Sequence, residues 1–455
     1  MNIAQRQLNK ATLPVVNPPG SSNTLNDWLP WLETLSPREI VLGLDRVHTV
    51  LGRLDLPRPS LVISVAGTNG KGSCAAMFDS LLGRGGMKTG CYTSPHLNFY
   101  NERIRIDGKP ASDELIVTAL AHVETVRGDV PLTFFEFGTL AALAAFASEG
   151  VDAWILEVGM GGRLDAVNAI EPDASLITSV SLDHCAWLGD DIESIATEKA
   201  GVMRASKPTI FGSPELPAAI SAVAMRLGTD LRVAGRDFRF EEHEDDAGQW
   251  SWQGRRIVRS GLRRPALTGR IQLQNAASVL AVLEALELDD LLAVDLVNEA
   301  LSTVRLDGRF QIVDAQNRWI LDVAHNPGAS VVLADRLREQ KFRGTVTAIV
   351  GMMADKDVAG FVAPLRDIVD TWIAVTVNGS RAESASVLAR KIANESQKPC
   401  RIVESATVAF QQAENNAASN DVVLVTGSFY LVGPALEWLA DRGQIVQTEG
   451  LATGQ

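Results

Sequence analysis

The sequence contains few cysteines, and none of them stand close together. No Cys-x-x-Cys pair occurs, so neither a zinc site nor a disulfide framework is indicated. Scattered cysteines of this kind favour reduced thiols in a cytoplasmic protein. The four residues are Cys74, Cys91, Cys185 and Cys400.

Apolar runs long enough to cross a membrane are also missing. Residues 139–147 form an apolar stretch, but it is too short to span a bilayer and predicts a buried helix instead. Residues 1–23 are polar and lack the apolar core of a signal peptide. We therefore expect a cytoplasmic location and no membrane partner.

Positive charge is scarce as well. Lysine and arginine number 42 against 55 acidic residues, which gives a net charge of −13 without any basic block. This balance argues against nucleic acid as a partner. A composition of 46% hydrophobic and 21% charged residues is typical of a globular protein, and 455 residues predict two or three domains. No unusual apolar stripe demands a partner chain, so we expect a monomer.

Residues 61–73, Leu-Val-Ile-Ser-Val-Ala-Gly-Thr-Asn-Gly-Lys-Gly-Ser, are the most informative stretch of the chain. An apolar run ends in a glycine-rich turn with one lysine, and a helical pattern follows, which predicts strand, loop and helix. The glycines would let backbone N–H groups approach a phosphate, and Lys71 would add a full positive charge. The stretch therefore predicts a phosphate-binding loop.

This loop departs from the strict Walker A pattern at two places. Val65 stands where that pattern has its first glycine, and Gly72 stands where it has serine or threonine, with Ser73 one residue late. The alternative is an ordinary glycine-rich connection whose lysine is merely solvated.

Beyond this loop, strands alternate with helices, which predicts a mostly parallel α/β sheet covered on both faces. Residues 230–259 are expected to form a small antiparallel excursion, and a helix at 274–286 closes the first domain. A second alternation of strands and helices predicts a smaller, Rossmann-like α/β domain. The predicted parts are a flexible tail at 1–24, an ATP-binding domain at 25–306 and a C-terminal domain at 307–455, with the active site in the cleft between the two domains.

Polar side chains follow three predicted strands of the first sheet. Ser94, Glu157 and His184 each stand at or just after a strand end, and Lys199 lies on the next helix. Because ligands bind beyond the carboxyl ends of such strands, these groups are expected to converge on a magnesium site. Singly, each has a structural alternative as a turn residue, helix cap, satisfied histidine or solvated lysine.

With these motifs the sequence resembles the Mur ligase superfamily and, within it, the bifunctional dihydrofolate synthases/folylpolyglutamate synthases. The resemblance runs from about Asp27 to Asp441, in order. The matching stretches include Ala-Gly-Thr-Asn-Gly-Lys-Gly-Ser (66–73), Thr-Ser-Pro-His-Leu (93–97), Leu-Glu-Val-Gly-Met-Gly-Gly-Arg-Leu-Asp-Ala (156–166), Asp-Val-Ala-His-Asn-Pro (322–327), Gly-Met-Met-Ala-Asp-Lys-Asp (351–357) and Thr-Gly-Ser-Phe-Tyr (426–430).

The resemblance implies a role for each residue that matches a functional position of the family. The implied ATP-binding residues are Thr68, Asn69, Gly70, Lys71, Gly72, Ser73, Asn275, Arg309 and Asp322. The implied metal ligands are Ser94 and Glu157 for a first Mg²⁺, and His184 and Lys199 for a second. The implied folate or pteroate contacts are Phe135, Asp165 and Ala166, and the implied glutamate contacts are His325 and Ser428.

Lys71, Lys199 and His325 are the catalytic residues that the resemblance implies. Lys199 would be carbamylated by CO₂ and would then offer an anionic oxygen to the second metal. Tyr430 is a departure, since relatives often have histidine at that place.

The implied reaction is the ATP-dependent joining of L-glutamate to 7,8-dihydropteroate and to tetrahydrofolate and its polyglutamates, through an acyl phosphate. Alternatives are folylpolyglutamate synthesis alone, another Mur-type ligase such as a peptidoglycan-precursor ligase, or a nucleotide-driven switch that needs neither carboxylate nor glutamate. The stretches 94–97 and 161–166 argue against the peptidoglycan ligase.

Overall fold

The computed structural model describes residues 17–36, 41–243 and 248–444. The chain forms two compact units, each of which comprises the described parts of two separate stretches. One unit takes Met1–Pro57 and Ser112–Glu149, and the other takes Arg58–Ala111 and Gly150–Gln455. In the described part of the chain, no helix is both long and apolar enough to cross a membrane.

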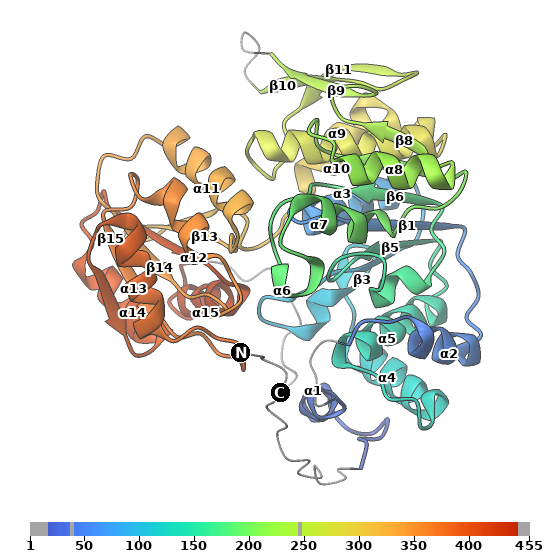
Figure 1. Ribbon diagram of the computed structural model, residues 1–455, viewed down its shortest axis with the longest axis horizontal. Helices are drawn as coiled ribbons and strands as arrows, with labels where there is room; N and C mark the ends of the chain where they lie inside the picture. Colours follow the sequence, from blue (N-terminus) through green and yellow to red (C-terminus); the bar gives the residue numbers. More distant parts are fainter. Residues whose placement is uncertain (1–16, 37–40, 244–247, 445–455) are drawn as a thin grey trace. The chain divides into compact units, whose positions relative to one another are not determined.

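The first unit is helical (Figure 1). Its helices are α1 (Leu25–Thr34), α2 (Asp45–Leu54), α4 (Asp113–Arg127) and α5 (Phe134–Ser148). Trp31 links α1 to α5, because its ring meets that of Phe137 edge-on at a centroid distance of 5.9 Å, and it also meets Trp28 of its own helix at 5.4 Å. Between α1 and α2, residues 37–40 lie outside the described residues. The apolar run 139–147 is confirmed as part of a buried helix.

The second unit contains a sheet of eight strands in the order β4-β3-β2-β5-β1-β6-β7-β8. Its strands are β1 (Leu61–Ala66), β2 (Thr89–Tyr92), β3 (Ile104–Ile106), β4 (Lys109–Pro110), β5 (Ala153–Glu157), β6 (Ala174–Ile177), β7 (Pro208–Phe211) and β8 (Asp230–Val233). All pairings from β2 to β8 are parallel, while β3 and β4 form an antiparallel edge. The predicted, mostly parallel sheet is confirmed.

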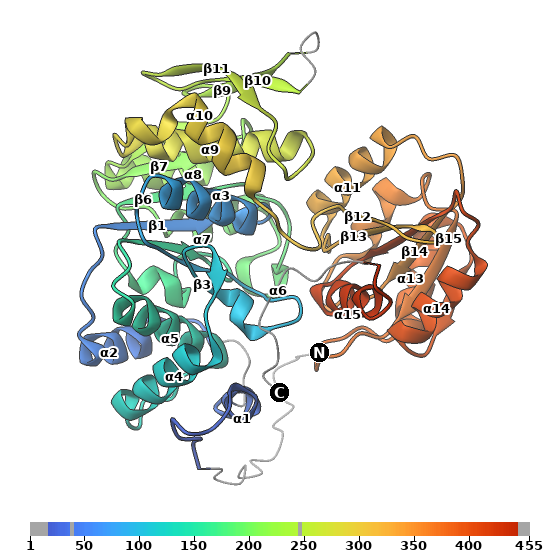
Figure 2. The ribbon, with the colours of Figure 1, turned by 180° about the vertical axis from the view of Figure 1, so that it is seen from behind.

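Apolar side chains of the central strand β1 pack against helices on one face of this sheet. Ile63 and Val65 are fully buried in one cluster with Met77 and Phe78 of α3. The helices on this face are α3 (Lys71–Arg84), α9 (Arg270–Ala285) and α10 (Val294–Thr303), which lie side by side (Figure 2). The unit also contains α6 (Cys185–Leu188), α7 (Ile192–Ala200) and α8 (Ala218–Leu227). The loop after β1 is thereby fixed between a buried strand and a buried helix.

The expectation of an antiparallel excursion over residues 230–259 is wrong for its first strand. Residues of β8 pair in parallel with β7 and extend the large sheet. Three later strands, β9 (Arg239–Glu242), β10 (Gln249–Gln253) and β11 (Val258–Arg263), do form an antiparallel sheet. The edge strand β8 is mostly half-buried, so its polar and apolar alternation looks like that of a hairpin.

A second, smaller sheet follows in the order β12-β13-β17-β14-β15-β16. Its strands are β12 (Gln311–Asp314), β13 (Arg318–Asp322), β14 (Val346–Val350), β15 (Thr371–Val375), β16 (Cys400–Val403) and β17 (Val422–Thr426). Only β12 is antiparallel to its neighbour. The predicted second α/β sheet is confirmed.

Alternate residues of these strands face different helices. Ile320 and Leu424 share a core with one group of helices, and Trp319 and Val425 share a core with the other. The first group is α11 (Pro327–Glu339), α12 (Val358–Val362) and α13 (Ala385–Ser396), and the second is α14 (Ala406–Asn416) and α15 (Phe429–Ala440). Helices on both faces leave the strand ends as the place where loops can build a site.

Candidate active site

The loop between β1 and α3 has the strand, loop and helix arrangement that the sequence predicts. Gly67 and Gly70 have φ angles of 142° and 91°, which side-chain-bearing residues rarely adopt. A Cβ atom on Gly67 would also overlap the hydroxyl of Thr178. Lys71 opens α3, and its Nζ donates to the carbonyl oxygens of Gly67 and Thr68 at 3.1 and 3.2 Å. The first-turn N–H groups of α3 have no acceptor within their own helix and are available to an anion.

A cavity of about 210 Å³ opens above this loop. It is lined by residues from the carboxyl ends of both sheets and from the helices that follow. Among the predicted site residues it brings together Thr68, Asn69, Gly70, Lys71, Gly72, Ser73, Ser94, Glu157, His184, Lys199, Asn275, Arg309, Asp322 and His325. It does not include Phe135, Asp165, Ala166 or Ser428.

Glu157 ends β5 and is only 5% exposed. Its Oε2 accepts one hydrogen bond, from the backbone N–H of Ser94 at 3.2 Å. Within the described residues the structure records no ion pair for this carboxylate. Burial raises its pKa, and the charge of Lys71 opposes that shift. A buried carboxylate with so little compensation is suited to a cation.

His184 offers a second group suited to a metal. It has a left-handed φ of 53° at the start of α6, and its Nδ1 is buried without a hydrogen-bond partner. Burial lowers the pKa of His184 to about 4, so the imidazole is neutral at pH 7. The unpartnered nitrogen can then act as a metal ligand.

Lys199 is buried in α7, with 4% of its surface exposed. Burial lowers its pKa to about 7, and the charge of Lys71 acts in the same direction. A large share of the amine is therefore neutral near pH 7, and a neutral amine is the form that reacts with CO₂. This environment fits a carbamylated lysine.

In the described part of the chain, no three His, Cys, Asp or Glu side chains form a metal-binding group. A metal at this cavity would therefore depend on mixed ligands: a hydroxyl, one carboxylate, one imidazole, a modified lysine and the oxygens of a bound phosphate. Magnesium accepts such oxygen-rich sets when a substrate phosphate contributes to them.

Arg309 and Asp322 bring charges from the second sheet to the cavity. Asp322 accepts backbone N–H bonds from Phe310 and Ala324, both at 2.8 Å. Nη1 of Arg309 is buried without an acceptor, and the guanidinium lies 5.2 Å from the ring centroid of Phe429. Burial lowers the pKa of Arg309 and raises that of Asp322. The unpaired N–H of Arg309 can receive an anionic ligand.

A buried ion pair beside the cavity was not predicted from the sequence. Oδ1 of Asp183 meets Nζ of Lys356 at 2.5 Å, and each side chain is 7% exposed. Oδ2 accepts from Nδ2 of Asn326 at 3.0 Å and lies 3.5 Å from Nε2 of His325. Burial raises the pKa of Asp183, but the hydrogen bond and charge of His325 and the charge of Lys356 outweigh it and hold this pKa well below its usual range. The only sequence signals were the Asp-His pair at 183–184 and the stretch 351–357.

Comparison with known proteins places the chain in a family. Residues 65–211 match the Mur ligase middle domain, and residues 308–429 match the glutamate ligase domain of the Mur ligases. The chain is 39% identical over 425 residues to the dihydrofolate synthase/folylpolyglutamate synthase of Escherichia coli K12, covering 93% of this chain and 97% of the other. It belongs to the Mur ligase family, among the dihydrofolate synthases/folylpolyglutamate synthases. The resemblance drawn from the motifs is confirmed.

Solved structures of the same family show the same fold. E. coli FolC in complex with DHPP and ADP is 38% identical, with a TM-score of 0.87 over 93% of this chain and all of that one. A bifunctional folylpolyglutamate synthase/dihydrofolate synthase with Mn, AMPPNP and L-glutamate bound is 41% identical, with a TM-score of 0.86 over the same shares. The M. tuberculosis folylpolyglutamate synthase complexed with ADP and AMPPCP is 29% identical, with a TM-score of 0.78 over 87% of this chain and 95% of that one.

In this Mur ligase, Asp165 lies beside the glycine-rich loop after β5. Its two oxygens accept from the backbone N–H groups of Met160 and Val167 at 2.9 and 3.0 Å. Burial raises its pKa to about 6. Asp165 is thus held as a cap of the loop, and Ala166 begins the short 3₁₀ helix η2 (Ala166–Ala169) that follows.

The remaining predicted residues of this Mur ligase lie at helix starts. Phe135 is half-buried in the first turn of α5, in the helical unit. Ser428 caps α15, where its Oγ accepts from the N–H of Tyr430 at 3.2 Å, and it is 5% exposed. The next residue, Phe429, lines the cavity. Tyr430 is 48% exposed, so its side chain is accessible to a ligand.

Proposed function

We propose that this Mur ligase joins L-glutamate both to 7,8-dihydropteroate and to tetrahydrofolate and its polyglutamates, at the expense of ATP. One observation carries the proposal. A single cavity is lined by the phosphate loop, by the buried carboxylate of Glu157, by the unpartnered Nδ1 of His184 and by Lys199, whose pKa is lowered. Relatives solved with DHPP and ADP, and with Mn, AMPPNP and L-glutamate, support the same set of ligands for this chain.

ATP is the nucleotide in this proposal. The backbone of Thr68, Asn69 and Gly70, together with Lys71, Gly72 and Ser73, would hold its phosphates at the start of α3. Asn275, Arg309 and Asp322 would hold the rest of the nucleotide. Lys71 now donates to loop carbonyls, and these weak contacts can be exchanged for phosphate oxygens.

Two Mg²⁺ ions would be held by Ser94 and Glu157, and by His184 and Lys199. When bound, they would neutralise charge on the phosphoryl group in transfer. Lys199 would act as a carbamate: its neutral nitrogen forms a bond to the carbon of CO₂ and loses one proton. The lowered pKa and the buried position of Lys199 support this modification.

The reaction has two steps in this account. The substrate carboxylate attacks the γ-phosphorus of ATP, the bond to ADP breaks, and an acyl phosphate forms. The amine of L-glutamate then attacks the carbonyl carbon, phosphate leaves and the amine gives up a proton. Lys71 stabilises the developing charge by electrostatics, and the loop positions the phosphoryl group.

His325 and Ser428 are proposed to contact glutamate. Nδ1 of His325 donates to the carbonyl oxygen of Val323 at 2.8 Å, which fixes the ring and turns Nε2 toward Asp183. Phe135, Asp165 and Ala166 are proposed to contact the pteroate. An aromatic ring can stack on a flat pterin, and a carboxylate can accept its N–H groups.

The remaining parts of the proposal concern the whole chain. We place the functional division between residues 25–306 and 307–455, after a tail at 1–24. A monomer and a cytoplasmic location complete the proposal. Light scattering of the purified protein tests whether it is a monomer. The free thiols of all four cysteines support the cytoplasmic location.

The experiment that tests this function supplies purified protein with ATP, Mg²⁺ and labelled L-glutamate, and with either dihydropteroate or tetrahydrofolate. The proposal expects glutamate incorporation with both acceptors and phosphate release only when acceptor and glutamate are both present. If glutamate is incorporated with tetrahydrofolate but not with dihydropteroate, the protein is a folylpolyglutamate synthase only. Phosphate release without either substrate would overturn the ligase in favour of a plain ATPase.

A further inference from the structure

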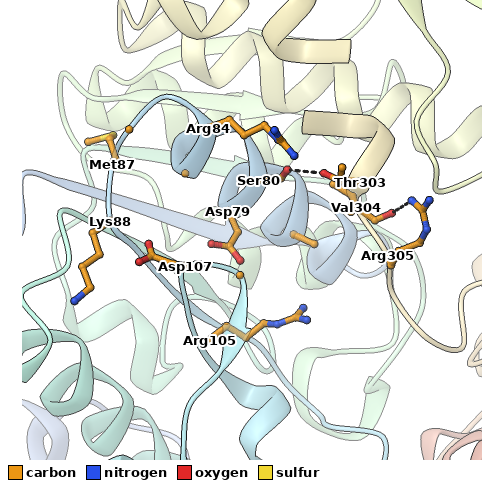
Figure 3. Close-up of a pocket in the computed structure, with 14 residues that line it drawn as sticks. Asp79, Ser80, Arg84, Met87, Lys88, Arg105, Asp107, Thr303, Val304 and Arg305 are labelled. Carbon is orange, nitrogen blue, oxygen red and sulfur yellow. Dashed lines mark hydrogen bonds between the residues drawn. The ribbon is translucent and has the colours of Figure 1, made fainter. Parts of the chain in front are cut away.

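A second cavity lies apart from the catalytic one. Its volume is about 650 Å³, and it shares no lining residue with the catalytic cavity. Its walls are the later turns of α3, the turn between β3 and β4, and residues 303–305 at the end of α10 (Figure 3). The two cavities lie toward opposite ends of α3, which has 14 residues and is roughly 20 Å long.

Arg105 lines this cavity, where burial raises the pKa of the nearby Asp79 and the charge of Arg105 opposes that shift. Across the described residues, the structure records no hydrogen bond or ion pair for its side chain, and Nε is buried without an acceptor. Its backbone is fixed, because Arg105 stands opposite Cys91 of β2 and Pro110 of β4 in the sheet. A buried donor on a charged group costs free energy unless a ligand supplies the acceptor.

The other arginines of this cavity already have partners. Arg84 pairs with Glu299, and Arg305 donates to the carbonyl oxygens of Ser302 and Val304 at 2.9 and 3.1 Å. Figure 3 shows the three guanidinium groups on three different elements around the cavity. Arg305 donates to neutral carbonyls and therefore adds positive potential, whereas the charge of Arg84 is offset by Glu299. Arg105 has donors to spare.

The acidic groups of the cavity are also engaged. Oδ1 of Asp79 accepts from Oγ1 of Thr89 at 2.5 Å, and Oδ1 of Asp107 accepts from the N–H of Thr89 at 2.9 Å. In Figure 3 these two carboxylates lie together on the side away from Arg305. The opposite side, between Arg105 and Arg305, is where an anion meets the least repulsion.

We propose that this cavity is a second ligand site, and that it binds a small molecule through a phosphate or carboxylate group held by Arg105. A guanidinium presents paired N–H donors that match both kinds of oxyanion. The volume falls within the range of roughly 300–1,000 Å³ that small-molecule sites occupy. Because residues 303–305 lie shortly before β12, such a ligand would touch the segment that leads from the first sheet to the second.

The test is equilibrium binding by calorimetry, with the catalytic cavity saturated by AMPPNP and Mg²⁺. Inorganic phosphate and succinate are titrated in separate arms, which distinguishes a phosphate ligand from a carboxylate one. Wild-type protein should bind at least one of the two probes at a single saturable site. Arg105→Gln should weaken that binding about tenfold or more, since a charge-assisted hydrogen bond is lost.

A second variant tests the cavity without touching the arginine. Gly83 lines the cavity in helical conformation, and a Cβ there would meet no atom within 4 Å. Gly83→Leu should therefore fold, fill the cavity and weaken binding as Arg105→Gln does. Arg226→Gln, an exposed change on α8, is the matched control and should leave binding unchanged.

Two results would overturn the proposal. One is that wild-type protein binds neither probe. The other is that Arg105→Gln and Gly83→Leu both bind as tightly as wild type and Arg226→Gln. If Arg105→Gln lowers the melting temperature so far that it does not fold, the Gly83→Leu result decides. Glutamate ligation by Gly83→Leu should match wild type, because this residue is remote from the catalytic cavity.

Discussion

Two carboxylates beside the catalytic cavity are buried alike and surrounded differently. Glu157 has one backbone N–H as its hydrogen-bond donor, and its pKa is raised by burial. Asp183 has Lys356, Asn326 and His325 around it, and its pKa is held far below the usual range despite burial. The difference separates a group kept open for a ligand from a group that holds the site together.

The same contrast applies to the basic residues. Lys356 pairs with Asp183 at 2.5 Å, whereas the hydrogen bonds that the described residues give Lys71 go to loop carbonyls at more than 3 Å. Buried polar groups that have few hydrogen-bond or charge partners within the protein therefore indicate where ATP, metal and substrate are expected. Buried polar groups that are fully paired, such as Lys356, instead stabilise the structure around the site.

The largest effect is expected at Lys71. Lys71→Ala should lower both ligase activities by about 10³-fold or more, because it removes positive charge from the transferring phosphoryl group. The melting temperature should change little, since within the described residues the side chain donates two long hydrogen bonds to loop carbonyls. Steady-state kinetics and thermal unfolding measure both. Lys391→Ala, on the exposed face of α13, is the control, and near-normal turnover in folded Lys71→Ala would contradict the phosphate-loop assignment.

The next effect concerns Lys199. Lys199→Ala should reduce turnover by about 10²-fold or more, because the proposed carbamate oxygen is lost from the site. Formate or another small carboxylate should restore part of the activity. A solvated lysine would instead tolerate the change at under about 0.5 kcal/mol in stability and with an unchanged rate. Mass spectrometry of native protein that shows an unmodified amine together with full activity would exclude the carbamate.

The pH dependence of stability gives a second measure of Lys199. In metal-free, CO₂-depleted protein its pKa is about 7 when folded, against 10.5 for the free side chain. Between those values the unfolded chain binds more protons, so stability gained through this group rises with pH, by at most about 1.4 kcal/mol per unit. Lys199→Met should therefore stabilise the protein more at pH 6 than at pH 10. An equal effect at both pH values would contradict the lowered pKa.

Variants of Asp183 and Glu157 are expected to differ in their effect on the free energy of unfolding. Asp183→Asn should destabilise the protein by about 3–5 kcal/mol, because the Lys356 charge stays buried without its partner. Glu157→Gln should leave stability unchanged or raise it, since it removes a buried charge with little compensation, while activity falls. Denaturant unfolding of both variants measures the difference. Equal destabilisation would remove the distinction between an open and a paired carboxylate.

The smallest effect is expected at Asp165. Asp165→Ala should cost about 1–2 kcal/mol of stability, because two backbone N–H groups lose their acceptor. If Asp165 also contacts the pterin, Asp165→Ala should lower kcat/KM more with dihydropteroate than with tetrahydrofolate. Kinetics with both substrates, alongside the melting temperature, separate the two roles. Equal losses with a lowered melting temperature would leave Asp165 as a loop cap only.

Local sequence patterns predicted the fold where they were strong. The fully buried strand β1 and the glycine-rich loop after it were identified from residues 61–73. The edge strand β8 was misassigned because it is only partly covered, so its pattern carries no sign of the neighbouring strand. Helix α4 was not assigned, and its weakly amphipathic pattern explains why.

The site was predicted one residue at a time, and its pairings were not. Motifs indicated Glu157, His184 and Lys199, and the structure places all three at the cavity. The Asp183–Lys356 pair joins positions 173 residues apart, and no local pattern carries that information. Arg105 gave no signal either, because an arginine in a strand looks solvent-exposed until the turn and helix around it are known.

The central claim is that a substrate carboxylate is activated by phosphoryl transfer from ATP. Dihydropteroate labelled with ¹⁸O in its carboxylate, incubated with ATP, Mg²⁺, L-glutamate and the enzyme, tests this most directly. Mass spectrometry of the released phosphate should find one ¹⁸O atom per phosphate, and the phosphate should equal the glutamate incorporated. Release of unlabelled phosphate alongside amide formation would contradict an acyl phosphate intermediate. It would also contradict the assignment of Glu157, Lys71 and Lys199 to phosphoryl transfer.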